Sequence, residues 1–212
     1  MFRPGLPVRA EQTYADLAEQ IGQLPPRFGS IRLVAVDGPS GAGKTTFANN
    51  LAKRLDAPVV RTDDLLDGWD DQFTFWERLE YRVLTRLRNG EPATYERYEW
   101  HRRAFGSPIT VEPAPAVLLE GVSAARRAIR PELTLAVFVT APSDLRFRRA
   151  LARDGDDSVA FRAYLGRWRA AEDRHFAADQ TAAAADLIVD GAATTGDDRF
   201  ARLTGRKDGV DS

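Results

Sequence analysis

The sequence contains no cysteine, and only two of its 212 residues are histidine, His101 and His175. These absences exclude disulfides, thiolate zinc sites, cysteine nucleophiles and metal centres with three histidine ligands. Lysine is also scarce, because only three of the 30 basic residues are lysine and the others are arginine. Clusters of arginine therefore reflect composition first and must be discounted accordingly.

Long apolar segments are missing as well. The longest apolar stretch, residues 133–139, is far shorter than the roughly 18 residues that a membrane span requires. Residues 1–10 lack the apolar core of a signal peptide. With 43% hydrophobic residues, 29% charged residues and a net charge of -1, the composition is that of a soluble globular protein. We therefore expect a cytoplasmic protein that binds neither a membrane nor polymeric nucleic acid.

Apolar runs alternate with segments of helical spacing along the chain. Short apolar runs predict five buried strands, at residues 31–36, 58–60, 116–119, 133–139 and 186–189. Helical spacing occurs at residues 10–24, 47–55, 76–87 and 159–178. Strands that alternate with helices predict an α/β fold with a five-stranded, mainly parallel sheet.

Composition divides the chain into three parts. Residues 1–30 are expected to form an N-terminal helix and a lead-in, and residues 31–191 a single domain. Residues 192–212 are rich in Gly, Thr, Asp and Arg and are expected to form a flexible tail.

The most informative segment is residues 38–45, GPSGAGKT, which matches the phosphate-binding pattern G-x-x-x-x-G-K-[ST] in full. It lies between an apolar strand and an amphipathic helix, which is the context that the pattern requires. In such a loop, backbone N–H groups encircle the phosphates, Lys44 reaches the β- and γ-phosphates, and Thr45 can ligate Mg²⁺. The residues expected to bind the nucleotide here are Gly38, Pro39, Ser40, Gly41, Ala42, Gly43, Lys44, Thr45 and Thr46.

Carboxylates follow two of the predicted strands. Asp63 and Asp64 come after the second strand, and the carboxyl ends of strands face the ligand crevice in an open α/β sheet. One of them could accept the proton of an attacking hydroxyl and hold Mg²⁺, although capping a turn is the alternative role. Glu120 ends the third strand and is a second candidate for positioning the metal. The absence of N-K-x-D and L-S-G-G-Q disfavours guanine-specific switch proteins and transporter-type ATPases.

Further segments follow the phosphate loop in a characteristic order. They include Tyr98-Glu99-Trp100, Leu119-Glu120-Gly121 and the arginine-rich residues 146–154. With the phosphate loop and the Asp63 segment, they resemble the uridine kinase family and related phosphoribulokinase-like kinases over residues 31–190. The resemblance implies a three-layer α/β/α P-loop fold and a kinase that uses ATP and Mg²⁺ to phosphorylate a hydroxyl of a small molecule, typically a nucleoside.

The resemblance also implies roles for single residues. Asp63 falls at the position of the family's catalytic base, and Arg149 and Arg153 match arginines that meet phosphate charge at a lid, here expected at about residues 153–160. The expected catalytic residues are Asp63, Lys44 and Arg153; Arg149 binds the nucleotide; and the metal ligands are Thr45, Asp63 and Glu120. The expected acceptor residues are Asp63, Trp69, Tyr98, Glu99, Trp100 and Arg103.

The chain departs from the family pattern in ways that leave acceptor recognition and lid chemistry open. Residues 155–157 are Gly-Asp-Asp, where the family's lid has a second arginine-rich turn. Glu99 replaces an aspartate, and His101 directly follows Trp100 instead of lying further along. Trp168 and Glu172 share one face of a predicted helix, and His175 on the same helix is expected to be structural.

Several functions therefore stay open at this point. The first is an ATP-dependent kinase of a nucleoside or a similarly sized polyol. The second takes a sugar phosphate, a pantothenate-like acid or an antibiotic hydroxyl instead, and the arginines at residues 97–103 would suit an anionic acceptor. The third is a nucleotide-binding regulatory protein that hydrolyses ATP slowly. The expected partner is a small hydroxyl acceptor, and homo-oligomers are left open.

Overall fold

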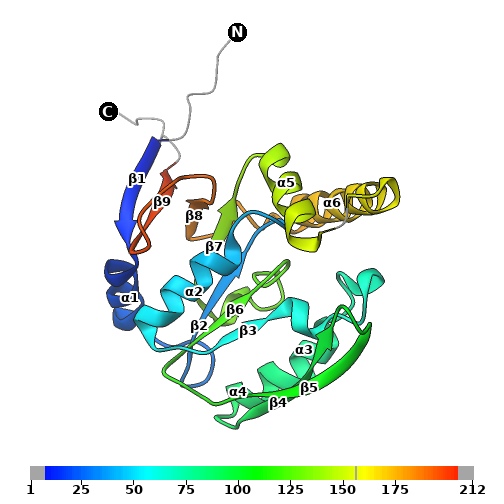
Figure 1. Cartoon of the computed structure of the whole chain (residues 1–212). Helices are drawn as coiled ribbons and strands as arrows, with labels where there is room; N and C mark the ends of the chain where they lie inside the picture. Colours follow the sequence, from blue (N-terminus) through cyan, green and yellow to red (C-terminus); the bar gives the residue numbers. More distant parts are fainter. Residues whose placement is uncertain (1–7, 156, 205–212) are drawn as a thin grey trace.

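The computed structural model describes residues 8–155 and 157–204 (Figure 1). Its α-helices are α1 (Tyr14–Gln23), α2 (Lys44–Leu55), α3 (Trp76–Leu79), α4 (Thr85–Arg88), α5 (Ser143–Asp154) and α6 (Val159–Asp179). Its strands are β1 (Val8–Thr13), β2 (Arg32–Asp37), β3 (Val59–Arg61), β4 (Ala93–Glu99), β5 (Ala104–Val111), β6 (Ala116–Glu120), β7 (Leu133–Thr140), β8 (Leu187–Asp190) and β9 (Arg199–Thr204). Shorter turns are the 3₁₀ helices η1 (Thr62–Leu65), η2 (Trp69–Asp71) and η4 (Arg130–Glu132) and the π-helix η3 (Glu80–Leu84).

The central sheet has seven strands in the order β1-β9-β8-β7-β2-β6-β3. The five strands predicted from the sequence, β2, β3, β6, β7 and β8, are present and pair in parallel. The prediction of five strands is short by two, because β9 pairs antiparallel with β8 and β1 pairs antiparallel with β9. The α/β fold with a mainly parallel sheet is therefore confirmed, with an antiparallel extension at one edge.

The extension also corrects the predictions for both ends of the chain. Residues 199–204 form β9 and not a flexible tail, because Phe200 is buried against Tyr14 and Phe47, with ring centroids 5.2 and 5.1 Å away. The N-terminal helix begins at Tyr14, later than expected, because residues 8–13 pair with β9 as a strand. Residues 1–7 and 205–212, which belong to the predicted lead-in and tail, lie outside the described residues.

Side chains of β2 point alternately to the two faces of the sheet, as a strand requires. Val34 and Val36 pack with α1 and α2 in one core cluster, whereas Leu33 and Ala35 pack in a second cluster on the opposite face. That second cluster contains the α3–η3–α4 segment and Trp168 of α6. Helices thus cover both faces, which confirms the three-layer α/β/α arrangement, and Figure 1 shows α2 crossing in front of the sheet.

A two-stranded hairpin, β4–β5, stands apart from the central sheet and packs beside α3 and α4 (Figure 1). Ala93, Tyr95 and Tyr98 of β4 are buried, so the hairpin contributes to the core on one side only. Its turn is residues 100–103, between the end of β4 and the start of β5. The sequence reading did not identify this hairpin.

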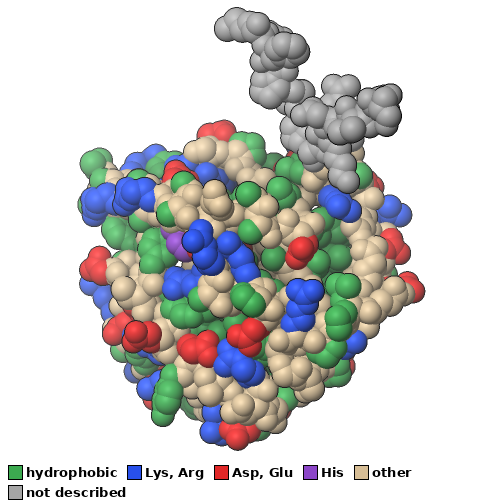
Figure 2. Space-filling model, turned by 180° about the vertical axis from the view of Figure 1, so that it is seen from behind, with side chains coloured by type: hydrophobic (Ala, Val, Ile, Leu, Met, Phe, Trp, Pro, Cys, Tyr) green, Lys and Arg blue, Asp and Glu red, His purple; other side chains and the backbone are tan. Residues whose placement is uncertain are grey.

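The face drawn in Figure 2 carries charged side chains of both signs together with hydrophobic ones. Figure 2 shows Lys and Arg side chains lying among Asp and Glu side chains on one face, in keeping with the net charge of -1. None of the helices in the described part of the chain combines the length and the apolar character that spanning a membrane would require.

Candidate functional site

The phosphate loop joins the carboxyl end of β2 to the first turn of α2, which begins at Lys44. Gly41 has a φ angle of 76°, and a Cβ atom there would lie 2.4 Å from the backbone O of Arg146. Only glycine fits this position, since a side chain would be both strained and blocked. The loop can therefore present main-chain N–H groups and the positive end of the α2 dipole to an anion, as the sequence predicts.

The loop lines a cavity of about 560 Å³ at the carboxyl ends of the parallel strands. The buried Lys44 side chain reaches into it, and its Nζ donates to the backbone O of Pro39 at 3.2 Å. The Thr45 hydroxyl donates to Oε1 of Glu120 at 3.2 Å. Other residues of the loop and of α2 that line this first cavity are Ser40, Gly41, Gly43, Thr46, Phe47 and Asn50.

Two carboxylates reach the first cavity from neighbouring strands. Glu120 ends β6, and Asp63 lies in η1 directly after β3, which pairs in parallel with β6. Burial raises the pKa of Glu120; nearby Lys44 opposes this rise and Asp63 adds to it. The oxygen donors of Thr45, Glu120 and Asp63 fit Mg²⁺, which is usually held by one or two carboxylates together with substrate phosphates. Among the described residues, no group of three or more His, Cys, Asp or Glu side chains could hold a metal ion.

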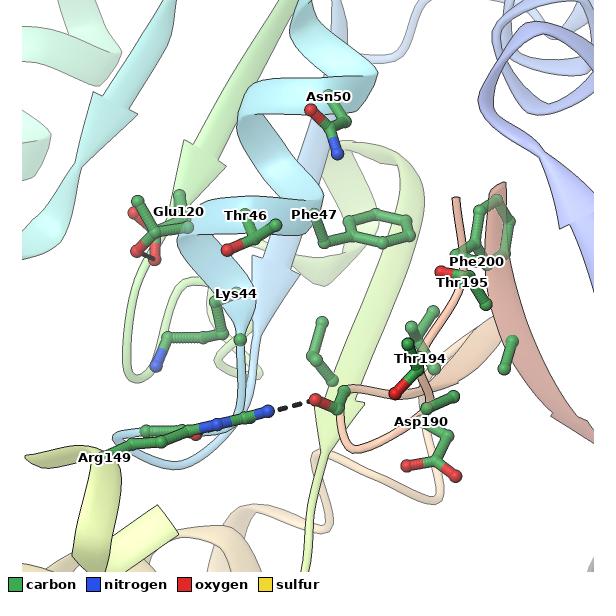
Figure 3. Close-up of a pocket in the computed structure, with 18 of the residues that line it drawn as sticks. Lys44, Thr46, Phe47, Asn50, Glu120, Arg149, Asp190, Thr194, Thr195 and Phe200 are labelled. Carbon is green, nitrogen blue, oxygen red and sulfur yellow. Dashed lines mark hydrogen bonds between the residues drawn. The ribbon is translucent and has the colours of Figure 1, made fainter. Parts of the chain in front are cut away.

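Arg149 of α5 closes one side of the first cavity. Its Nη1 donates to the backbone O of Gly41 at 3.2 Å and to the backbone O of Gly191 at 2.9 Å, so it bridges the phosphate loop and the segment after β8. Figure 3 shows Lys44, Arg149 and Thr194 around the cavity. The sequence analysis did not identify the segment at residues 190–196 as part of the site, although its first two residues, Asp-Gly, directly follow a predicted strand. A Cβ atom on Gly191 would lie 1.8 Å from the backbone O of Ala42.

A second cavity of about 610 Å³ lies between the turn of the β4–β5 hairpin, η2 and α6. The predicted acceptor residues Asp63, Trp69, Trp100 and Arg103 all line it, although they come from three separate segments. Trp69 packs against Trp100 at 4.6 Å and against Trp168 at 5.5 Å between ring centroids. The cavity therefore has an aromatic wall, and Trp168 of α6 belongs to it.

The other two predicted acceptor residues lie elsewhere. Tyr98 is buried and packs edge-on against Trp100 and Phe105, and Glu99 accepts hydrogen bonds from the backbone N–H of Ser107 and from Arg102. These donors lower the pKa of Glu99. Neither residue is among the described residues that line the second cavity. Both belong to β4, where pairing with β5 sets the direction of their side chains.

Glu172 of α6 connects the second cavity to the phosphate loop. Its side chain is fully buried and accepts hydrogen bonds from the backbone N–H and the hydroxyl of Ser40. It also accepts from Nε1 of Trp168 at 2.9 Å. The sequence placed Trp168 and Glu172 on one helix face but did not connect them to Ser40. His175 stacks on Phe73 at 4.7 Å and does not line either cavity in the described part of the chain.

The sequence reading also missed Asp37, the last residue of β2. Its carboxylate is fully buried and accepts from the backbone N–H groups of Gly38, Ser123 and Ala125. It thereby ties the start of the phosphate loop to the segment that follows β6. Burial raises its pKa to about 6, against the lowering effect of these hydrogen bonds and of Lys44. A charged residue that ends an apolar strand just before Gly38 was the available signal.

The two cavities meet at one place. Ser40, Asp63, Ala150 and Arg153 line both of them, so a group bound in one cavity can approach a group bound in the other beside Asp63 and Arg153. The lid expected at residues 153–160 corresponds to the connection between α5 and α6, and its Asp156 lies outside the described residues. The arrangement offers an anion-binding cavity, a second cavity with aromatic and basic lining, and a carboxylate between them.

The chain resembles known kinases in sequence. The chain is 26% identical over 140 residues to a uridine kinase of Borrelia duttonii. The aligned region covers 58% of this chain and 68% of the relative. It is 29% identical over 141 residues to a uridine kinase of Staphylococcus haemolyticus, with the same shares covered. The resemblance to uridine kinases is therefore confirmed, and the similarities support a P-loop kinase of small molecules.

Solved structures show the same fold. A protein from Bacillus stearothermophilus described as a possible uridine kinase has a TM-score of 0.59 at 22% identity, covering 82% of this chain and 96% of that one. A candidate fructose transport system kinase from a Silicibacter species has a TM-score of 0.62 at 22% identity, covering 79% and 95%. Residues 33–203, which are most of the chain and include the phosphate loop and both carboxylates, match the family model described as the AAA domain. The chain belongs to this AAA domain family of P-loop proteins.

Proposed function

We propose that the protein is an ATP-dependent kinase that transfers the γ-phosphoryl group to a hydroxyl of a small molecule. The observation that carries the proposal is the meeting of the two cavities at Ser40, Asp63 and Arg153. A phosphate-loop protein that only hydrolyses ATP needs no second cavity of about 610 Å³ opening beside its terminal-phosphate site. The names of the relatives favour a nucleoside as acceptor, and the aromatic wall of Trp69, Trp100 and Trp168 supports an acceptor with a flat or apolar face.

The residues of the first cavity suit a nucleotide with its magnesium ion. The N–H groups of residues 41–45 and the Lys44 ammonium would hold the phosphates, and Arg149 and Arg153 would meet their outer charge. Thr45 and Glu120 would hold Mg²⁺, with Asp63 near enough to contribute. Bound Mg²⁺ supplies positive charge that offsets the negative charge on the transferred group.

Asp63 is the residue proposed to act on the acceptor. When the acceptor oxygen forms its bond to the γ-phosphorus and the bond from that phosphorus to the oxygen of ADP breaks, the hydroxyl proton passes to the Asp63 carboxylate. Lys44 and Arg153 stabilise the charge that moves onto the leaving oxygens. Because phosphoryl transfer requires little covalent help, positioning and charge supply most of the rate.

Replacing Asp63 tests the proposal. The Asp63→Asn variant should keep its affinity for an ATP analogue but lose turnover by about 10²–10⁴-fold, the usual contribution of a positioned general base. The measurements are the dissociation constant of a non-hydrolysable ATP analogue and the rate of ADP formation with an acceptor that the unmodified protein accepts.

Asp64→Asn is the matched control, because Asp64 is adjacent to Asp63 but is not among the described residues that line either cavity. Its turnover should stay within a few-fold of the unmodified protein. Unchanged turnover in Asp63→Asn would remove Asp63 from the mechanism. ADP formation that no acceptor stimulates would favour the slow ATPase instead.

A further inference from the structure

The second cavity is lined by more positive charge than a neutral acceptor needs. Four arginines line it, Arg103, Arg146, Arg153 and Arg169, and Asp63 is the one carboxylate among its described lining residues. Three of these arginines, Arg103, Arg146 and Arg169, do not line the first cavity in the described part of the chain. They are therefore placed to serve whatever the second cavity binds and not the nucleotide.

Arg146 of α5 is the most constrained of these cations. Its residue is only 9% exposed, its Nε donates to the backbone O of Ala141 at 3.1 Å, and its buried Nη1 has no hydrogen-bond partner among the described residues. Burial is the main cause that lowers its pKa, and the charge of Arg169 lowers it further, whereas the charges of Glu172 and Asp173 oppose the shift. The nearby Glu172 carboxylate is already bound by Ser40 and Trp168. A guanidinium in this state gains from an anion that brings acceptor oxygens to it.

Arg169 of α6 approaches the same cavity from the opposite helix. Its Nη2 donates to the backbone O of Ser143 at 3.1 Å and also to the Ser143 hydroxyl, while its buried Nε has no partner among the described residues. The guanidinium carbon lies 5.2 Å from the centre of the Phe147 ring, which limits its movement. No ion pair between Arg169 and a carboxylate occurs within residues 8–155 and 157–204. These two restrained arginines repel each other, and the carboxylates that partly offset the charge of Arg146, Glu172 and Asp173, do not line the second cavity in the described part of the chain.

We propose that the acceptor carries a phosphate or carboxylate group that Arg146 and Arg169 bind, with Arg103 at the cavity mouth, while its apolar part lies on the aromatic wall. The inference rests on the proposed kinase function and makes an anionic acceptor the substrate class instead of a neutral nucleoside. A planar guanidinium donates two parallel hydrogen bonds to either oxyanion, which is why both sources are tested.

The first test measures anion binding directly. The protein is loaded with Mg²⁺ and a saturating non-hydrolysable ATP analogue, so that the phosphate loop is filled, and is then titrated with inorganic phosphate or with acetate while NMR spectra are recorded. We expect saturable binding of at least one anion, and the tighter of the two identifies the group. No saturable binding of either anion would overturn the inference.

Variants locate the binding site. Arg169→Gln and Arg103→Gln should each weaken anion binding about tenfold, the usual cost of losing a charge-assisted contact, and Arg169→Lys should recover part of the loss. Arg148→Gln is the matched control, because Arg148 lies on α5 near Arg146 but is exposed and bound to Asp144. Equal affinity in Arg169→Gln, in Arg103→Gln and in the control would overturn the assignment.

Matched acceptors separate this inference from the kinase function. ADP formation is measured with fructose and fructose 6-phosphate, with pantothenol and pantothenate, and with uridine. The anionic member of at least one pair should have a KM about tenfold below that of its neutral partner, and Arg169→Gln should remove this difference. A KM for uridine below those of both anionic compounds would overturn the inference and leave the kinase function intact. Failure to bind the ATP analogue would instead remove the proposed function.

Discussion

Asp37 holds the phosphate loop through a buried carboxylate that has no cationic partner in direct contact within the described residues. Three backbone N–H groups, from Gly38, Ser123 and Ala125, point at its two oxygens. These hydrogen bonds and the charge of Lys44 favour the ionised form, but complete burial opposes it more strongly and raises the pKa from 3.8 to about 6. One residue therefore fixes the geometry of the loop and makes it sensitive to pH.

Folding stability should depend on pH through Asp37. Because the folded protein holds this proton more tightly than the unfolded chain, the carboxyl favours folding below pH 3.8, and that contribution is lost as the pH rises through about 6. The free energy of unfolding of the unmodified protein, minus that of Asp37→Asn, should therefore fall between pH 4 and pH 7 by on the order of 3 kcal/mol. Urea unfolding at a series of pH values measures this difference. A difference that stays constant or grows with pH would contradict the assignment.

At the scale of elements, α6 links the two cavities. Trp168 forms part of the aromatic wall, and one turn later Glu172 binds the Ser40 N–H and hydroxyl in the phosphate loop. The Trp168 Nε1 donates to the same carboxylate at 2.9 Å. A ligand that moves Trp168 therefore acts on the phosphate loop through a single buried side chain.

Glu172→Gln should weaken this link. A carboxylate can accept from Ser40 and Trp168 together, whereas an amide turns its NH₂ group toward one of these donors and leaves it unsatisfied. The free energy of unfolding should drop by about 1–3 kcal/mol, and the affinity for an ATP analogue should drop with it. Asp173→Asn, next in sequence and exposed, is the control and should change neither quantity. Unfolding and binding measurements equal to those of Asp173→Asn would show that the link has no energetic role.

The burial and pairing of each strand explain whether it can be predicted from the sequence. β2, β6 and β7 are buried on both faces and therefore read as continuous apolar runs, which local inspection detects. The strands β1 and β9 are partly exposed, and they form by pairing with each other although they are far apart in the sequence. No local pattern reports such a pairing. A helix was predicted over residues 76–87, but the π-helical segment η3 in its middle was not.

At the scale of the whole molecule, the second cavity of the candidate site forms only when distant segments of the chain come together. The phosphate loop is contiguous, so its pattern reveals it, whereas the second cavity combines Trp69, Trp100, Arg146 and Trp168 from four separate segments. Tyr98, Glu99, Trp100 and Arg103 were all expected to contact the acceptor. Pairing within the hairpin brings only the turn residues Trp100 and Arg103 to the lining of the second cavity in the described part of the chain. Arginine clusters had to be discounted in the sequence. Arg146 and Arg169 stand out only in the structure, because the buried Arg146 Nη1 and Arg169 Nε have no hydrogen-bond partner in the described part of the chain.

The packing of β9 against the rest of the fold should support nucleotide binding. Phe200 of β9 is 2% exposed, packs between Tyr14 and Phe47, and lines the first cavity with them. Phe200→Ala should therefore lower the free energy of unfolding by about 3–5 kcal/mol, because it removes a large buried ring and leaves a cavity. Such a loss is a large part of the 5–15 kcal/mol that stabilises a typical domain.

Ligand binding distinguishes a local cavity from a weakened site. The ATP analogue is added at about 100 times its dissociation constant for the unmodified protein. If Phe200→Ala binds it equally well, this concentration should raise the free energy of unfolding of the variant by about 2.7 kcal/mol. We expect a smaller increase in the free energy of unfolding, because the substitution removes part of the lining of the first cavity and weakens binding of the analogue. Arg202→Ala, on the same strand but exposed, is the control and should match the unmodified protein in stability and in recovery. Full recovery in Phe200→Ala would mean that β9 stabilises the fold without shaping the nucleotide site.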